Sequence, residues 1–230
     1  MIDFHSHILP GIDDGSKSVE ETLQLLRMLS DQGIKIVCAT PHFNADRISV
    51  DDFLEKRTAS YKSLEGILTD DLPEIRQGAE VAYYEGISRM ESLSKLCIEG
   101  TGLLLIEMPF TAWTEFTVQE IIQLSCSGNM RIVLAHIERY LPYLKKSVLN
   151  RILETDILLQ VNASFFNDFP TRRKALKMLK NGDIQLFGSD CHNTSVRPPK
   201  LSDALCIVEK KMGAEYLDDM FGYWFSLFKK

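Results

Sequence analysis

The 230-residue sequence lacks features that would mark a membrane or secreted protein. No uninterrupted apolar stretch approaches the roughly 18 residues expected of a membrane-spanning helix. The N-terminal stretch from Met1 to His5 has neither the basic nor the apolar region of a signal peptide. The five cysteines, at positions 38, 97, 126, 191 and 206, form no C-x-x-C pair, which is typical of a reducing compartment. We therefore expect a cytoplasmic protein that does not insert into membranes.

The sequence also lacks an excess of positive charge. It has 26 Lys and Arg residues against 32 Asp and Glu residues, a formal net charge of -6, which argues against a nucleic-acid partner. The apolar fraction of 45% and the charged fraction of 25% are those of an ordinary globular protein. Because α/β barrels of this length form one unit, we expect a single domain over residues 1–230.

Short apolar runs alternate with amphipathic segments along the whole chain. This alternation predicts repeated strand-helix units around a parallel sheet. The expected strands are Ile2 to Phe4, Ile34 to Ala39, Ile75 to Ala79, Leu103 to Ile106, Ile132 to Ala135, Ile157 to Val161 and Ile184 to Phe187.

Two helix starts carry a capping-box pattern. Ser18 to Glu21 precedes one apolar helical stripe, which Gly33 is expected to end. Thr117 to Glu120 precedes a second stripe, with Gly128 as the expected stop. Further helices are expected over residues 51–68, 147–154, 171–179, 201–212 and 213–230.

All five histidines and four carboxylates follow predicted strands. In a strand-helix barrel the carboxyl ends of the strands meet at one face, so we expect these side chains to share one pocket. They are His5, His7, Asp14, His42, Glu80, Glu107, His136, Asp190 and His192.

This set of side chains predicts a metal centre. His5 and His7 are two residues apart, so in an extended chain they point the same way and can bind one ion. Imidazole and carboxylate without thiolate suit manganese, iron, zinc or cobalt. Nine ligands exceed the need of one ion, which favours several ions and the hydrolysis of a phosphate ester. Arg139 and Arg197 lie near the same face and can offer paired donors to phosphate oxygens.

Several motifs together resemble the PHP (polymerase and histidinol phosphatase) superfamily, and within it the bacterial tyrosine phosphatases of the CpsB, CapC and YwqE type. The resemblance spans residues 1 to about 200. It is carried by His5-Ser6-His7 through Gly15, Thr40-Pro41-His42, Gly78-Ala79-Glu80, Ile106-Glu107, Ala135-His136-Ile137-Glu138-Arg139-Tyr140 and Ser189-Asp190-Cys191-His192 through Pro199.

The resemblance implies a distorted (β/α)7 TIM-like barrel with three divalent ions, manganese first and iron, zinc, cobalt or magnesium as alternatives. It implies that metal-activated hydroxide hydrolyses phosphotyrosine. The substrate would be the phosphotyrosine tail of a bacterial tyrosine kinase of capsule or exopolysaccharide synthesis. Arg139 and Arg197 would bind the phosphate, and His42 joins them as a catalytic residue. The implied ligand sets are His5, His7, Glu80 and Asp190; Glu80, Glu107 and His136; and Asp14, His42 and His192, with Asp13 as the alternative to Asp14.

Three other functions compete with this interpretation. An amidohydrolase would carry a modified Lys after the fourth strand and a His after the sixth, where this chain has Glu107 and Asn162. A histidinol-phosphate phosphatase shares the superfamily and the metals. A non-catalytic phosphotyrosine-binding regulator would keep the same residues without turnover. A cysteine-based phosphatase would need a reactive thiolate in a C-x5-R loop, a spacing that Cys191 and Arg197 have. Cys191 lies between two proposed metal ligands and has no thiolate partner, so we expect it to be a neutral filler.

Two groups of aromatic residues complete the analysis. Tyr84, Phe110, Trp113 and Phe116 follow the third and fourth strands and could form a rim for the phosphotyrosine ring or part of the core. The tail has six aromatic residues, which predict a terminal helix that packs on the barrel or makes a subunit contact. They are Tyr216, Phe221, Tyr223, Trp224, Phe225 and Phe228. Membrane docking is disfavoured, because the basic residues there are only Lys229 and Lys230.

Overall fold

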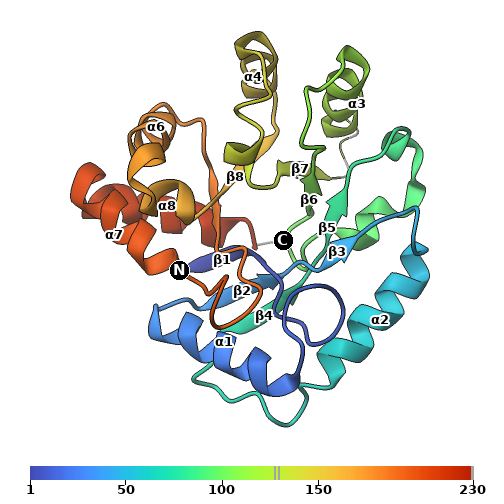
Figure 1. Ribbon diagram of the computed structural model, residues 1–230, viewed down its shortest axis with the longest axis vertical. Helices are drawn as coiled ribbons and strands as arrows, with labels where there is room; N and C mark the ends of the chain where they lie inside the picture. Colours follow the sequence, from blue (N-terminus) through green and yellow to red (C-terminus); the bar gives the residue numbers. More distant parts are fainter. Residues whose placement is uncertain (127, 129, 229–230) are drawn as a thin grey trace.

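The computed structural model describes residues 1–126, 128 and 130–228, and shows parallel strands surrounded by helices (Figure 1). One sheet has the order β1-β2-β4 and the other the order β3-β5-β6-β7-β8-β9. The strands are β1 (Ile2–Ser6), β2 (Ile36–Ala39), β3 (His42–Phe43), β4 (Glu74–Gln77), β5 (Glu80–Ala82), β6 (Leu103–Glu107), β7 (Arg131–Leu134), β8 (Leu158–Asn162) and β9 (Leu186–Gly188).

The two sheets are joined because two long strands are each interrupted. β2 continues into β3 across Thr40 and Pro41, and β4 continues into β5 across Gly78 and Ala79. A proline has no N–H for the sheet, so pairing breaks at Pro41 and resumes with His42 opposite Glu80. The interruption places two candidate metal ligands side by side.

The ring of strands is linked between its first and last members. The Asp190 N–H donates to the His5 carbonyl at 2.8 Å, and the His7 N–H donates to the Cys191 carbonyl at 2.9 Å. Seven strand positions thus follow one another in chain order and curl back on themselves. The expected distorted (β/α)7 barrel is confirmed.

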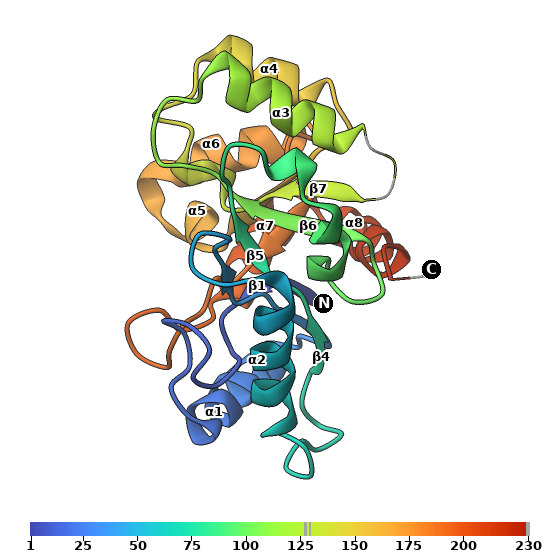
Figure 2. The ribbon, with the colours of Figure 1, turned by 90° about the vertical axis from the view of Figure 1, so that its right-hand side faces the viewer.

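The helices form an outer layer that packs on the curled sheet (Figure 2). Each expected helix is present, and four of them have bounds within two residues of the expectation. The helices are α1 (Val19–Asp31), α2 (Val50–Lys62), α3 (Glu115–Ser125), α4 (Lys146–Leu153), α5 (Ser164–Asn167), α6 (Phe169–Lys180), α7 (Leu201–Met212) and α8 (Ala214–Ser226).

The first capping box is nearly as expected. The Ser18 side chain accepts from the Glu21 N–H at 3.3 Å, which satisfies one free donor at the start of α1. Glu21 reaches back one residue further than expected, because its carboxylate accepts from the Lys17 N–H at 2.9 Å. Gly33 has a φ of +78° and ends the helix.

Three helix boundaries were predicted wrongly, and one of them is the end of α8, which lies at Ser226 and not at the expected residue 230. α3 is capped by Thr114, whose side chain accepts from the Thr117 N–H at 3.1 Å, so Thr117 lies inside the first turn. α2 ends at Lys62, before the expected Leu68, because tight turns through Gly66, at φ +78°, follow it. The short α5 and the 3-10 helices η1 (Ile87–Arg89), η2 (Glu91–Leu96) and η3 (Ile137–Arg139) were not predicted.

The aromatic tail packs as a helix on the outside of the first and last strands. Trp224 is fully buried, with its ring centroid 5.5 Å from that of Phe4 and 5.7 Å from that of Phe187. Its indole N–H donates to the Gln185 carbonyl at 2.8 Å. Lys229 and Lys230 lie outside the described residues. Among the residues that are described, no helix has the length and apolar character needed to cross a membrane.

Candidate metal centre

All nine expected ligands lie at the carboxyl ends of the strands, at one face of the ring. Segments as distant in sequence as β1 and the loop after β9 therefore supply neighbouring side chains. All nine are part of one ion-pair network around Glu80 and Asp190. The network joins His5, His7, His42, Glu80, Glu107, His136, Asp190 and His192, with Asp14 at its outer edge.

Glu80 is the central carboxylate. Its Oε2 atom lies 3.0 Å from His42 Nδ1 and 3.3 Å from the Nε2 atoms of both His5 and His7. Its Oε1 atom lies 2.8 Å from His136 Nε2. Burial opposes the charge of Glu80, but the surrounding imidazoles outweigh burial and hold the pKa well below its usual range. A carboxylate shared among so many nitrogens is suited to bridge cations.

The histidines divide into two electrostatic classes. Burial lowers the pKa of His5, but the carboxylates of Glu80 and Asp190 outweigh burial and raise it above its usual value. Burial and the neighbouring His7 lower the pKa of His192 to about 4. Burial likewise lowers the pKa of His136, which favours the neutral imidazole that a metal ligand requires.

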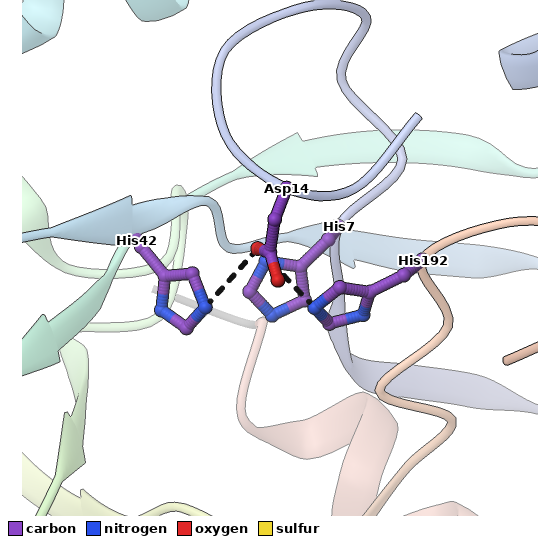
Figure 3. A group of neighbouring side chains, drawn as sticks. All are labelled: His7, Asp14, His42 and His192. Carbon is purple, nitrogen blue, oxygen red and sulfur yellow. Dashed lines mark ion pairs between the residues drawn. The ribbon is translucent and has the colours of Figure 1, made fainter. Parts of the chain in front are cut away.

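Ligand atoms gather in four overlapping groups, within each of which they lie within 4.8 Å of one another. The groups overlap because His5, His7, His42 and Glu80 each belong to more than one of them, and they differ from the expected sets: His136 gathers with His5 and Glu80, whereas Glu107 gathers with His42 and Glu80. The groups are His7, Asp14, His42 and His192; His5, His7 and Asp190; His5, Glu80 and His136; and His42, Glu80 and Glu107. Figure 3 shows the first of them, with Asp14 facing His42 and His192.

The two neighbouring aspartates have different positions. Asp13 faces inward, where its carboxylate accepts from the His42 N–H at 3.1 Å and lies 2.7 Å from His7 Nδ1. Asp14 is 64% exposed, and its Oδ1 atom lies 3.4 Å from His42 Nε2 and 3.5 Å from His192 Nε2. Asp13 therefore orients the His7 ring, whereas the exposed carboxylate of Asp14 lies between His42 and His192 at the outer edge of the site.

Several buried polar atoms in this cluster make no hydrogen bond within the described part of the chain. They are Glu80 Oε2, His136 Nδ1 and His192 Nε2. Leaving buried polar atoms without partners is costly, and an ion of opposite charge is one way to satisfy them. The orphan atoms and the nitrogen and oxygen donor set both fit divalent metals.

Two residues of β8 support the cluster and were not anticipated. Gln160 Oε1 accepts from the His136 N–H at 2.7 Å and lies 3.2 Å from His5 Nδ1. Asn162 donates to Asp190 Oδ2 at 2.8 Å. Polar groups that hold the far side of a ligand fix its orientation. Their signal in the sequence is the pair of amides in the otherwise apolar strand Leu158–Asn162.

Backbone geometry is unusual at two candidate ligands. Among the described residues, His136 and Asp190 are the non-glycine positions with positive φ, at 31° and 51°. Such conformations are rare and often occur at functional sites. Gly188, beside them, has no room for a side chain, since a Cβ atom would lie 2.5 Å from His5 Cβ and 2.7 Å from Gln160 Nε2.

Both expected arginines lie beside Asp190. Asp190 Oδ2 accepts from Arg139 Nη2 at 2.5 Å and from Arg197 Nη2 at 2.7 Å. Both side chains are about one third exposed, at 37% and 36%, and they line a cavity of about 230 Å³ together with Asn162 and Lys200. Two guanidinium groups face one carboxylate, so positive charge is left over toward this cavity.

The four rim candidates differ in position. Trp113 is only 9% exposed and packs in the core. Phe116 is 52% exposed on α3, and Tyr84 is half-buried. Phe110 is 46% exposed and stacks on His136. Cys191 is fully buried, and burial raises its thiol pKa far above the usual value, so it is a neutral filler.

Comparison with known proteins agrees with this geometry. The family model of capsular polysaccharide synthesis, CpsB/CapC, matches residues 1–223. The chain is 28% identical over 221 residues to the tyrosine-protein phosphatase YwqE of Bacillus subtilis, covering 94% of this chain and 86% of YwqE. It is 29% identical over 235 residues to the tyrosine-protein phosphatase CpsB of Streptococcus agalactiae, covering 96% and 95%.

Solved structures show the same likeness. A chain from the crystal structures of YwqE from Bacillus subtilis and CpsB from Streptococcus pneumoniae, described as metal-dependent tyrosine phosphatases, has a TM-score of 0.83 and 26% identity, covering 100% of this chain and 94% of that chain. A histidinol phosphate phosphatase from Lactococcus lactis has a TM-score of 0.56 and 13% identity, covering 91% and 92%, and shares the fold.

Proposed function

This chain belongs to the CpsB/CapC family of capsular polysaccharide synthesis, and we propose that it is a metal-dependent protein-tyrosine phosphatase. The observation that supports this most is the convergence of imidazoles and carboxylates from successive strand ends beside a pair of arginines. Metal ligands and guanidinium groups in one place suit the hydrolysis of a phosphate monoester.

We propose three divalent ions, manganese first, held by the residues whose ligand atoms gather at the strand ends. On the ligand sets that the family resemblance implies, His5, His7, Glu80 and Asp190 would hold the first, Glu80, Glu107 and His136 the second, and Asp14, His42 and His192 the third; all nine residues belong to the overlapping groups of ligand atoms. When bound, such ions lower the pKa of water and stabilise negative charge on phosphoryl oxygens. Glu80 Oε2 and His192 Nε2, which make no hydrogen bond among the described residues, would then face a cation.

The protein's own residues position the substrate and the ligands. Arg139 and Arg197 bind the phosphate oxygens through guanidinium N–H groups that are already held in place by Asp190. Asp13 and Gln160 hold the far nitrogens of His7 and His5, which leaves both Nε2 atoms directed at Glu80. His42 is 38% exposed at the mouth, where it can meet the leaving group as a catalytic residue.

The substrate we propose is the phosphotyrosine tail of a bacterial tyrosine kinase of capsule or exopolysaccharide synthesis. The net charge of -6 does not oppose this anionic substrate, because four of the carboxylates counted in it are candidate metal ligands.

Two measurements test the proposal. Protein purified without chelator is assayed for bound metal by mass spectrometry, and less than one equivalent of transition metal would argue against the centre. The metal-loaded protein is then given a phosphotyrosine peptide and histidinol phosphate side by side. We expect phosphate release from the peptide at least about tenfold faster in kcat/KM; a preference for histidinol phosphate would favour that activity, and binding without release would favour a regulator.

A further inference from the structure

Phe110 is an apolar side chain placed beside the metal centre and left open to solvent. It is 46% exposed, whereas most large hydrophobic residues of the chain are buried. Its ring centroid lies 6.0 Å from that of His136, with the planes 16° apart. His136 Nε2 in turn lies 2.8 Å from Glu80 Oε1. One imidazole therefore separates the phenyl ring from the central carboxylate.

The segment that carries Phe110 is fixed on both sides. The preceding Met108 N–H donates to the Tyr140 hydroxyl at 3.0 Å, and Trp113 donates from its indole to the Pro109 carbonyl at 3.1 Å. The ring centroid of Phe110 lies 5.3 Å from that of Tyr140, which packs in turn 5.4 Å from Trp113. Buried aromatic rings thus hold Phe110 from behind, so its exposed face is preorganised.

We infer that Phe110 is the specificity-determining residue of this site, contacting the phenyl ring of phosphotyrosine and thereby favouring aryl over alkyl phosphate esters. The inference rests on the proposed phosphatase function. A phosphate held at the metal centre has its ester oxygen within reach of the surrounding side chains, and in phosphotyrosine that oxygen is bonded directly to an aromatic ring. Aromatic pairs with centroids about 4.5 to 7 Å apart attract each other, and an alkyl ester has no ring to pair.

The other aromatic residues nearby do not have this combination of features. Trp113 is buried behind Tyr140, so it supports the stack but cannot meet a substrate. Phe116 is 52% exposed in the first turn of α3, and among the described residues no ring pairs with it. Phe110 is the rim candidate that is both exposed and in contact with a candidate metal ligand. Phe116 is therefore a matched control.

The test compares Phe110→Ala and Phe110→Leu with Phe116→Ala on two peptides of identical sequence, one with phosphotyrosine and one with phosphoserine. We expect Phe110→Ala to lower kcat/KM for phosphotyrosine by about 10- to 100-fold and to leave phosphoserine within about twofold. Phe110→Leu, which keeps apolar volume, should fall between. Phe116→Ala should match the wild type. Equal losses on both peptides, or no loss on phosphotyrosine, would overturn the inference.

A binding measurement separates this inference from the proposed activity. Calorimetry with metal-loaded protein gives the affinities of phenylphosphonate and methylphosphonate, neither of which is hydrolysed. Wild-type protein should bind phenylphosphonate about tenfold more tightly, and Phe110→Ala should remove that preference with unchanged metal content. If wild-type protein shows the preference but releases no phosphate from the peptides, the phosphatase proposal fails and the ring contact stands. If wild-type protein shows no preference, the ring contact fails whatever the activity.

Discussion

The metal centre has two flanks of opposite character. The Asp190 flank consists of Asp190, Arg139, Arg197 and Asn162, and is polar and held by hydrogen bonds of 2.5 to 2.8 Å. The Phe110 flank consists of Phe110, Tyr140 and Trp113, and is held by packed rings. Arg139 and Tyr140 are neighbours in the chain, yet they belong to different flanks. The turn at η3, entered through the left-handed His136, directs them apart.

This difference separates two tasks in substrate recognition. The Asp190 flank offers positive charge, which every phosphate monoester can use equally. The Phe110 flank offers an aromatic surface, which only an aryl ester can use. If the proposed function holds, binding of the phosphate and choice of the ester group fall to different residues, and each flank can be altered while the other is kept.

The largest expected effect follows from removing the residue that joins the Asp190 flank to the metals. In Asp190→Ala, His5 and His7 lose a partner carboxylate, and both arginines lose their shared acceptor. We expect at least one metal equivalent to be lost by mass spectrometry and kcat/KM to fall by about 10³-fold or more, which corresponds to several kcal/mol.

The control for this substitution is Asp219→Ala, an exposed aspartate on α8. It should keep the metal content and change stability by no more than about 0.5 kcal/mol. Full metal content and activity in Asp190→Ala would contradict the placement of Asp190 between the metals and the arginines.

A smaller effect is expected from each arginine alone. Arg139→Ala and Arg197→Ala should each lower kcat/KM by about 10²- to 10³-fold, because each removes a preorganised donor to the phosphate. Metal content should be unchanged. Substitution by Lys keeps the charge but loses the planar pair of donors, so an intermediate loss is expected.

Arg151→Ala is the matched control for the arginines. Arg151 is 39% exposed and pairs with Glu115 at 2.7 Å, so its exposure and pairing are close to those of Arg139. It lies on α4 and should leave activity unchanged, with at most about 1 kcal/mol lost from stability. If an arginine variant of the Asp190 flank loses metal as well as activity, its role is to support the centre and not to bind phosphate.

The sequence alone predicted most of the strands and the gathering of the candidate ligands that position the two flanks. The strand positions followed from apolar runs, and the gathering of the histidines followed from their position after those strands. The wrong start of α3 arose because Thr114 and Thr117 can both serve as caps, and local sequence does not say which one meets the first free N–H groups. The observed cap places Thr117 inside the helix and Thr114 at its start.

What could not be predicted depends on pairing between distant segments. Gln160 and Asn162 lie on β8. Their contacts with His136 and Asp190 depend on the register in which β8 pairs with β7 and β9. The different positions of Asp13 and Asp14 depend on how the loop after β1 folds back, with Asp13 also capping the Gly15 N–H at 2.9 Å. Neither the register between two strands nor the path of a loop can be inferred from a local sequence pattern.

The smallest expected effect is the coupling between the two flanks, measured by a double-mutant cycle. Arg197 and Phe110 lie on opposite flanks, and no contact joins them among the described residues. The losses in kcat/KM that Arg197→Ala and Phe110→Leu cause for a phosphotyrosine peptide should therefore multiply, with a coupling energy within about 0.5 kcal/mol. By contrast, Arg139→Ala and Arg197→Ala share Asp190 Oδ2 and should couple by about 0.5 to 3 kcal/mol. A coupling across the flanks as large as the coupling within the Asp190 flank would mean that the ring and the arginines position the substrate as one unit, which would remove the division of tasks inferred from their geometry.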